Sequence, residues 1–375
     1  MYLGSNLLPI CRTKPQKRFF QLLPTPRLAP YLSQRCGIKM HVNNSISNLP
    51  KQHFVSRMQE GEFVFGGEIE YSTSLDLQTY RNQANFLKSH TSVLAIPDNP
   101  GSNIFLSNIA IAQVIQSLYP YDLVLSISCR DTNRLGLATR LITAYSLGFR
   151  NLLLVTGDHP SLGSVPSSKP VFDLDSTQLL HLCHEFNQSG TLFGNYFEKS
   201  QGIDYKLCQN ADSDQDFCII PPRLVVGTVI NPQNSLPEIE MARFQRKKTE
   251  GIDFIQTQVI FQAEAVIPLL KEFHHEKIPI MAGIVPLNNY SLAKKISNFL
   301  PGVKFPKSLL QAYKIASQNS DNSKNKAKMF DKININYYSP LITELKHKNL
   351  IQGLYFATID YPIIIPALIR SILNG

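Results

Sequence analysis

One pattern of apolar and polar residues recurs along most of the chain. From about residue 62 onward, a short run rich in β-branched and other apolar residues precedes a segment with the spacing of an amphipathic helix, and this unit occurs eight times. The predicted strands are Phe63–Tyr71, Val93–Asn99, Asp122–Cys129, Asn151–Gly157, Leu224–Asn231, Phe254–Phe261, Pro279–Leu287 and Gly353–Asp360. The predicted helices are Leu75–Lys88, Asn108–Leu118, Asn133–Leu147, Ser176–Phe186, Leu236–Glu250, Glu264–Glu276, Ser291–Phe299 and Pro362–Leu373.

This alternation predicts the fold class. Strands that alternate with helices pair in parallel through βαβ crossovers, and eight such units indicate a closed (β/α)₈ TIM barrel of the α/β class. An open doubly wound sheet is the competing architecture, but it usually has a G-x-G-x-x-G first turn, which the sequence lacks. Two segments, Asn187–Arg223 and Ser317–Tyr338, exceed ordinary loop length, and we expect both to be surface excursions.

The excess positive charge lies at the start of the chain. The formal net charge is +9, and nine of the 37 Lys and Arg residues precede Glu60, the first acidic residue. The remaining basic residues balance the 28 Asp and Glu residues, which argues against a nucleic-acid partner for the folded part. We therefore divide the chain into a basic leader, residues 1–59, and a single barrel domain, residues 60–375. The leader fits a disordered or targeting segment, a functional basic arm, or translated sequence ahead of a start at Met40.

The cysteines and the apolar runs exclude several classes of protein. No C-x-x-C pair occurs and no cysteine lies near a histidine at metal-ligand spacing, so we expect neither a metal site nor a disulfide framework. No apolar run approaches the roughly 18 to 20 residues that span a bilayer, so we expect no membrane association. These features predict a soluble intracellular protein, cytoplasmic, or organellar if the leader is a transit peptide.

Polar residues at the carboxyl ends of the predicted strands are candidates for function, because active sites of such barrels form there. Glu68 lies in an otherwise apolar strand, where burial would raise its pKa and suit a general acid, although a partner cation or solvent is an equally consistent environment. Asp158 follows a strand and a glycine at the barrel mouth, where aspartates are also common turn formers. Gln256 and Gln258 share one face of a strand, so either both line the barrel or both face outward.

Three longer segments of the predicted barrel carry a distinctive combination of strand ends and turns. They are CRDTNRLGLATRLITAYSLGFRNLLLVTGDHP (Cys129–Pro160), GIDFIQTQVIF (Gly251–Phe261) and IMAGIVPLNNYSLAKKI (Ile280–Ile296). These segments resemble the third-to-fourth-strand region, the GADFIQTQ strand, and the seventh strand with its helix in the methylenetetrahydrofolate reductase family. KPVFDLDS and VINPQNS lie between them in the order of that family, and the resemblance covers roughly residues 62–373.

The resemblance implies a function and a set of site residues. It implies a barrel that binds FAD, accepts a hydride from NADH or NADPH, and passes it to 5,10-methylenetetrahydrofolate in one-carbon and methionine metabolism. It implies Glu68 as the acid that assists opening of the folate imidazolidine ring, Asp158 as the carboxylate beside the flavin, and Gln258 as the amide that contacts folate. The flavin-contacting residues that it implies are Thr156, Gly157, Asp158, Phe172, Asn231, Glu240, Arg246 and Lys247.

The chain departs from the family mainly on the substrate side. Tyr71-Ser72 replaces the usual Pro-Pro after the first-strand acid, Leu292 stands where bacterial reductases have Gln, and Asp360 stands where they have Arg. The resemblance therefore implies FAD more firmly than it implies the substrate. Two other functions remain open: a related barrel flavoprotein with another substrate or a protein electron donor, and a non-catalytic folate- or flavin-binding subunit. A homo-oligomer is possible in each case.

Overall fold

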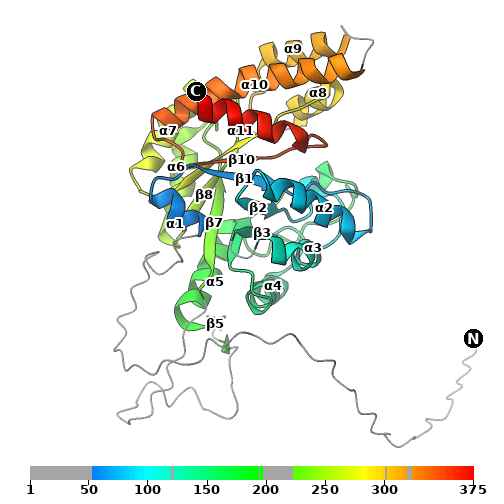
Figure 1. Cartoon of the computed structure of the whole chain (residues 1–375). Helices are drawn as coiled ribbons and strands as arrows, with labels where there is room; N and C mark the ends of the chain where they lie inside the picture. Colours follow the sequence, from blue (N-terminus) through cyan, green and yellow to red (C-terminus); the bar gives the residue numbers. More distant parts are fainter. Residues whose placement is uncertain (1–52, 120–121, 194, 197–222, 300–301, 319–322) are drawn as a thin grey trace, which may run out of the picture. The chain divides into compact units, whose positions relative to one another are not determined.

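Eight parallel strands form a closed barrel (Figure 1). The computed structural model describes residues 53–119, 122–193, 195–196, 223–299, 302–318 and 323–375. The strands are β1 (Val64–Glu68), β2 (Val93–Ile96), β3 (Leu123–Ser128), β4 (Asn151–Val155), β7 (Val225–Ile230), β8 (Phe254–Val259), β9 (Ile280–Ile284) and β10 (Gly353–Phe356). They pair in the order β1-β10-β9-β8-β7-β4-β3-β2, and β2 closes the barrel on β1. Each predicted strand contains one observed strand, which confirms the predicted (β/α)₈ barrel.

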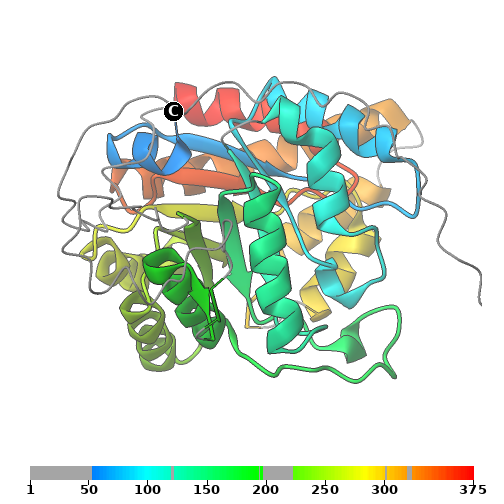
Figure 2. The ribbon, with the colours of Figure 1, turned by 90° about the horizontal axis from the view of Figure 1, so that it is seen from below.

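Helices surround the barrel on the outside (Figures 1 and 2). They are α2 (Leu77–Lys88), α3 (Asn108–Ile115), α4 (Arg134–Ser146), α5 (Ser176–Ser189), α6 (Pro237–Thr249), α7 (Ala263–His274), α8 (Tyr290–Phe299), α9 (Lys307–Gln318), α10 (Ser323–His347) and α11 (Ile365–Asn374). Every predicted helix overlaps an observed one. The short strands β5 (Thr191–Leu192) and β6 (Asn195–Tyr196) pair antiparallel after α5, and residues 197–222 of the first expected excursion lie outside the described residues.

We expected Ser317–Tyr338 to be a surface excursion, and this expectation is wrong. Most of it belongs to the 25-residue helix α10, which lies beside α9 and α11 (Figure 1). The polar run at the start of α10 concealed the helix, because the first buried side chain along it is Phe330. From there α10 buries Asn334, Tyr338 and Leu341, which gives the helix a face directed at the barrel.

The interior of the barrel is filled by inward-facing side chains of alternate strand positions. Val64, Val124, Leu153, Val225 and others form a buried cluster that also contains the fully buried ring of Phe254. A Cβ at Gly227 would lie 2.2 Å from the Phe254 ring, so the ring occupies the space that a side chain at this position would need. A second, larger cluster packs the outer surface of the strands against the helices.

Helix α1 (Phe54–Gln59) closes the amino-terminal end of this interior. Phe54 is fully buried, and its ring meets the Phe254 ring edge-on with the centroids 5.2 Å apart. His53 caps the helix, and its Nε2 forms a 2.7 Å hydrogen bond with Asn151 Oδ1 at the start of β4. Residues 54–59, which we assigned to the leader, therefore pack on the barrel. Residues 1–52 lie outside the described residues, so the rest of the leader stays a prediction.

No helix in the described part of the chain is long and apolar enough to span a bilayer. Nor do the described residues contain a group of three or more His, Cys, Asp or Glu side chains arranged to hold a metal ion.

Candidate active site

Two adjoining cavities open at the carboxyl ends of the strands. The mouth cavity has a volume of about 570 Å³ and is lined by residues from all eight barrel strands or the loops that follow them. The side cavity, about 530 Å³, lies between the end of β7 and helices α5 and α6. Both volumes are in the range of about 300 to 1,000 Å³ that is typical of ligand pockets. The two cavities share Thr156, Ser176, Val229, Lys247 and Gln258, so they form one two-lobed site.

Glu68 lines the mouth cavity as the last residue of β1. Burial raises the pKa of its carboxyl group to about 8, and the neighbouring Glu70 carboxylate adds to the rise. Among the described residues, no hydrogen bond or ion pair engages this carboxyl group, so the partner cation that the sequence left open is not seen. At neutral pH Glu68 is therefore mostly protonated and has a proton available to a ligand in the cavity.

Gln256 and Gln258 both line the mouth cavity, which decides between the two orientations that the sequence allowed. The pairing of β8 with β9 shifts register between Gln256 and Val259, and Gln258 Oε1 accepts a 3.1 Å hydrogen bond from the Val259 amide. The side chain of Gln258 makes no other hydrogen bond in the described part of the chain. The amide group of Gln258 therefore keeps both its donors for a polar ligand.

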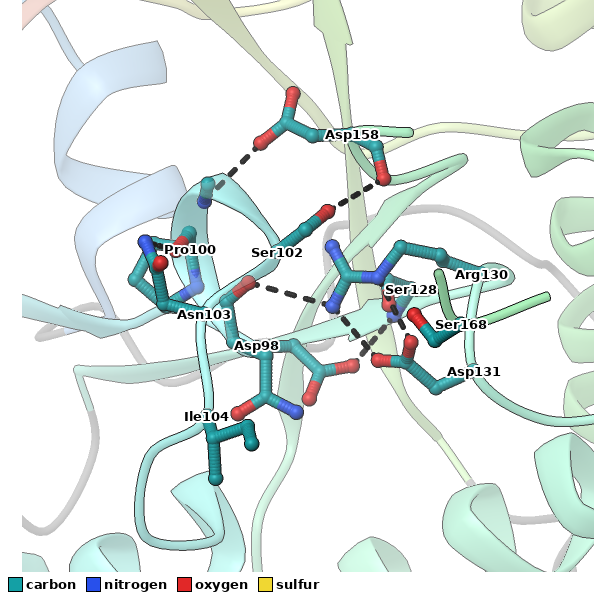
Figure 3. A network of polar contacts seen from close by, with 12 residues as sticks. Asp98, Pro100, Ser102, Asn103, Ile104, Ser128, Arg130, Asp131, Asp158 and Ser168 are labelled. Atoms are coloured by element: carbon teal, nitrogen blue, oxygen red, sulfur yellow. Dashed lines mark hydrogen bonds and ion pairs between the residues drawn. The ribbon is translucent and has the colours of Figure 1, made fainter. Parts of the chain in front are cut away.

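Asp158 lies on the loop after β4 and is braced by the loop after β2 (Figure 3). Its Oδ2 accepts a 3.2 Å hydrogen bond from the Gly101 amide, and its carbonyl oxygen accepts one of 2.8 Å from Ser102 Oγ. A Cβ at Gly163 would lie 1.9 Å from the Ser102 carbonyl oxygen, so the two loops approach as closely as only glycine permits. Asp158 is thus a loop-bracing residue and also an exposed carboxylate that lines the mouth cavity.

A buried guanidinium lies beside Asp158 in the same network (Figure 3). Arg130 Nε and Nη2 donate to the two carboxylate oxygens of Asp131 at 2.8 and 2.6 Å, which raises the pKa of Arg130. The neighbouring Asp98 carboxylate is occupied by Arg140, at 2.7 and 2.8 Å. Arg130 and Asp98 both line the mouth cavity, and Asp98 also ties α4 to the loop after β2.

Ser128 and Arg130 were not among the site residues that the resemblance implied. The Ser128 hydroxyl is buried and has no hydrogen-bond partner in the described structure, and the residue lines the mouth cavity. The only signal in the sequence was the position of both residues at the end of the third strand. Gly157 packs between them with φ +92°, and a Cβ there would lie 3.1 Å from the Cβ atoms of both. This position therefore requires glycine.

Lys247 stands between the two cavities. Its ammonium group donates a 2.7 Å hydrogen bond to the Val229 carbonyl oxygen at the end of β7. Burial lowers the pKa of Lys247, and the Glu240 carboxylate opposes this shift. Arg246 is exposed and lines the side cavity with Thr156, whose Oγ1 donates a 3.1 Å hydrogen bond to Ser176 Oγ at the start of α5.

The resemblance implied Glu240 and Phe172 as flavin contacts, but in the structure the side chains of both contact other parts of the protein. Glu240 is buried and braces the loop after β7, since its carboxylate accepts hydrogen bonds from the Asn231 amide at 2.7 Å and from Asn234 Nδ2 at 3.1 Å. Glu240 and Asn231 still line the side cavity. Phe172, with φ +40°, lines neither cavity in the described structure, and its ring packs near the His159 ring.

The sequence of the barrel matches known proteins. Residues 221–372 match the family model of methylenetetrahydrofolate reductase. A protein of Schizosaccharomyces pombe named methylenetetrahydrofolate reductase 2 is 24% identical over 264 residues, a match that covers 68% of this chain and 36% of the relative. Residues 221–372 of the chain are thus similar to the methylenetetrahydrofolate reductase family. The resemblance seen in the sequence is thereby confirmed, although the match spans only about a third of the length of this reductase.

A solved structure shares the fold. It is an uncharacterized protein from Clostridium thermocellum that binds two copies of 5-methyl-5,6,7,8-tetrahydrofolic acid. It superimposes with a TM-score of 0.50 and 13% identity, covering 85% of this chain and 97% of that protein. At this identity the likeness concerns the architecture.

Proposed function

We propose that this barrel is a flavin-dependent oxidoreductase that reduces 5,10-methylenetetrahydrofolate to 5-methyltetrahydrofolate, with NADH or NADPH as the hydride donor. The observation that carries the proposal is Glu68, an unpaired carboxyl group with a pKa of about 8 in the mouth cavity of a barrel related to methylenetetrahydrofolate reductases. The Clostridium thermocellum protein of the same fold binds a methylated tetrahydrofolate, which supports the same substrate class.

The polar groups of the mouth cavity suit the chemistry of the folate step. Opening the imidazolidine ring requires a proton on the departing nitrogen, and Glu68 holds one at neutral pH. The ring-opened carbon carries positive charge, which the fixed Asp158 carboxylate would stabilise. The Gln258 amide offers donors and an acceptor that suit a pterin ring.

The two-lobed site also fits FAD, which supplies hydride transfer when it is bound. The buried, unpartnered Ser128 hydroxyl fits a polar heterocycle above the strand ends. Lys247 and Arg246 at the side cavity would face the pyrophosphate as a point charge and a fork-shaped donor. Thr156, Gly157 and Asn231 complete the proposed flavin contacts, and Glu240 would act by holding the Asn231 loop.

The visible spectrum of the purified protein tests the flavin part of the proposal. We expect a yellow protein with the absorbance of an oxidised flavin, and we expect NADH or NADPH to bleach it under anaerobic conditions. A protein that binds folate but stays colourless after incubation with FAD would instead be a non-catalytic binding subunit. A flavin that neither nucleotide reduces would point to a protein electron donor.

Replacing Lys247 tests the cofactor site residue by residue. A charge-assisted hydrogen bond contributes about 1.5 to 3 kcal/mol, so Lys247→Ala should weaken FAD binding by roughly one to two decades. Equilibrium titration of the apoprotein with FAD measures this. Lys248→Ala is the matched control, because Lys248 is the next residue of α6 and pairs with Glu276 on the surface. Equal FAD affinities of the two variants would remove Lys247 from the cofactor site.

A further inference from the structure

Helix α10 presents a row of polar side chains to the carboxyl ends of the last three strands. Asp331, Asn334 and Tyr338 have the i, i+3, i+7 spacing of one helix face, and Tyr337 flanks it. We call these four residues the α10 clamp. We propose that the α10 clamp positions the substrate-side wall of the mouth cavity, the wall formed by the ends of β8, β9 and β10. What this wall binds rests on the proposed function.

Each clamp residue holds a strand exit at a defined point. Tyr337 Oη donates a 2.7 Å hydrogen bond to the Phe261 carbonyl oxygen beyond β8. Tyr338 Oη donates one of 2.9 Å to the Val285 carbonyl oxygen beyond β9. Asp331 accepts a hydrogen bond from the hydroxyl group of Tyr361, beyond β10. One helix therefore fixes three consecutive strand exits.

Asn334 makes the densest set of contacts in the clamp. Its side chain is fully buried, and its Oδ1 accepts hydrogen bonds from the Leu287 amide at 3.1 Å and from Tyr313 Oη at 2.7 Å. Its Nδ2 donates to the carbonyl oxygens of Leu287 and Phe330, both at 2.8 Å. Both donors and both acceptor positions of the amide are thus used. The Asn334 side chain therefore bonds both the amide and the carbonyl oxygen of Leu287.

The clamp bonds the cavity lining itself at one point, the Val285 carbonyl oxygen, and otherwise bonds residues just beyond the lining. Val259, Val285 and Ile359 line the mouth cavity, and the clamp engages Phe261, Leu287 and Tyr361, two residues beyond each of them. Within the described part of the chain, no clamp residue lines either cavity itself. The four residues are therefore positioning residues, which act on the wall through the strand exits.

The flavin-side wall is built from other elements. Thr156, Asp158 and Lys247 lie on the loop after β4 and on α6, and none of the clamp hydrogen bonds reaches these elements. A loosened clamp should therefore disturb folate binding and leave FAD binding in place. A merely structural role of α10 would weaken both together.

The test compares Asn334→Ala with wild type, using FAD-loaded protein and 5-methyltetrahydrofolate as the probe. We expect the Kd for the probe to rise by about tenfold or more, since displacements near 1 Å at a binding wall have effects of this order or larger. FAD affinity should stay within about twofold of the wild-type value, because no hydrogen bond of the clamp reaches the flavin-side wall. Hydrogen exchange of the peptide that contains Leu287 should become faster. Tyr338→Phe, which removes one hydroxyl group, serves the same comparison if Asn334→Ala does not fold.

Asn151→Ala is the matched control. Asn151 is also buried, but it bonds His53 and the Leu123 carbonyl oxygen at the opposite end of the barrel. It should lower stability without changing the Kd for the probe. Equal loss of FAD and probe binding in Asn334→Ala, or an unchanged Kd for the probe, would overturn the proposal. If wild type itself binds no folate, the proposed function fails, and the Leu287 exchange rate alone then decides whether the clamp orders this wall.

Discussion

Glu68→Gln should slow the reduction of 5,10-methylenetetrahydrofolate by about 10² to 10⁴, the usual contribution of general acid catalysis. The substitution keeps the size and polarity of the side chain and removes the proton that it can transfer. Reduction of the bound flavin by NADH or NADPH needs no proton from this residue, so that half-reaction should keep its wild-type rate. Stopped-flow measurement of the two half-reactions separates them.

Glu70→Gln is the control for this variant. Glu70 lies two residues further along, where it accepts a 3.4 Å hydrogen bond from the Tyr361 amide and does not line the mouth cavity in the described structure. Its folate half-reaction should slow far less than that of Glu68→Gln. An equal loss of both half-reactions in Glu68→Gln would indicate a damaged flavin site, and a normal folate step would remove Glu68 from the mechanism.

The raised pKa of Glu68 also predicts how stability depends on pH. The unfolded chain releases this proton near the ordinary value of 4.5, whereas the folded protein keeps it up to about pH 8. The folded state binds more protons across this window, so the contribution of Glu68 to stability falls as pH rises from about 4.5 to 8. Glu68→Gln does not titrate. Its melting temperature relative to wild type should therefore increase between pH 5 and pH 8, and a constant difference would contradict the raised pKa.

Phe54→Ala should lower the free energy of unfolding by about 3 to 5 kcal/mol, the usual cost of truncating a fully buried phenylalanine. The ring of Phe54 is the contact between α1 and Phe254 inside the barrel, so its loss leaves a cavity at the amino-terminal end. Urea unfolding followed by circular dichroism measures the change. FAD affinity should be retained under native conditions, because the site lies at the opposite end.

Phe86→Ala on α2 is the control for this variant, since Phe86 is 37% exposed and its removal opens no enclosed cavity. Phe86→Ala should lower the free energy of unfolding much less than Phe54→Ala does. If both variants unfold at the same urea concentration as wild type, α1 is not part of the folding unit and the barrel begins at β1.

The barrel could be predicted because its signal is local and repeated. Each strand and each helix of the repeating unit has its own apolar period, so eight units were readable without knowledge of their contacts. Helix α1 and helix α10 lacked this signal. The six residues of α1 follow a long basic segment, and α10 begins with a polar run and uses Asn334 and Tyr338 on its buried face. The buried residues of these two helices contact partners that are distant in the sequence. Phe54 of α1 packs on Phe254, and Asn334 of α10 bonds Leu287.

The position of the site could be predicted from the sequence, but the surroundings of several of its residues could not. The rule that barrel sites form at strand carboxyl ends selected Glu68, Asp158 and Gln258, and all three line the mouth cavity. Whether Glu68 faced a cation or a cavity depended on the packing of seven other strands, which alternation within one strand cannot decide. The bracing of Glu240 against Asn231 and the place of Phe172 outside the cavities depend on loop conformation, for which the sequence carries no period.

Reoxidation of the reduced protein by 5,10-methylenetetrahydrofolate tests the proposed function most directly. The protein is loaded with FAD, reduced anaerobically, and mixed with the folate while the flavin absorbance is followed and the product is identified by chromatography. The proposed function predicts that the absorbance of the oxidised flavin returns and that 5-methyltetrahydrofolate forms in an amount equal to the reoxidised flavin. A flavin that stays reduced in the presence of 5,10-methylenetetrahydrofolate, but is reoxidised by an artificial electron acceptor, would contradict it.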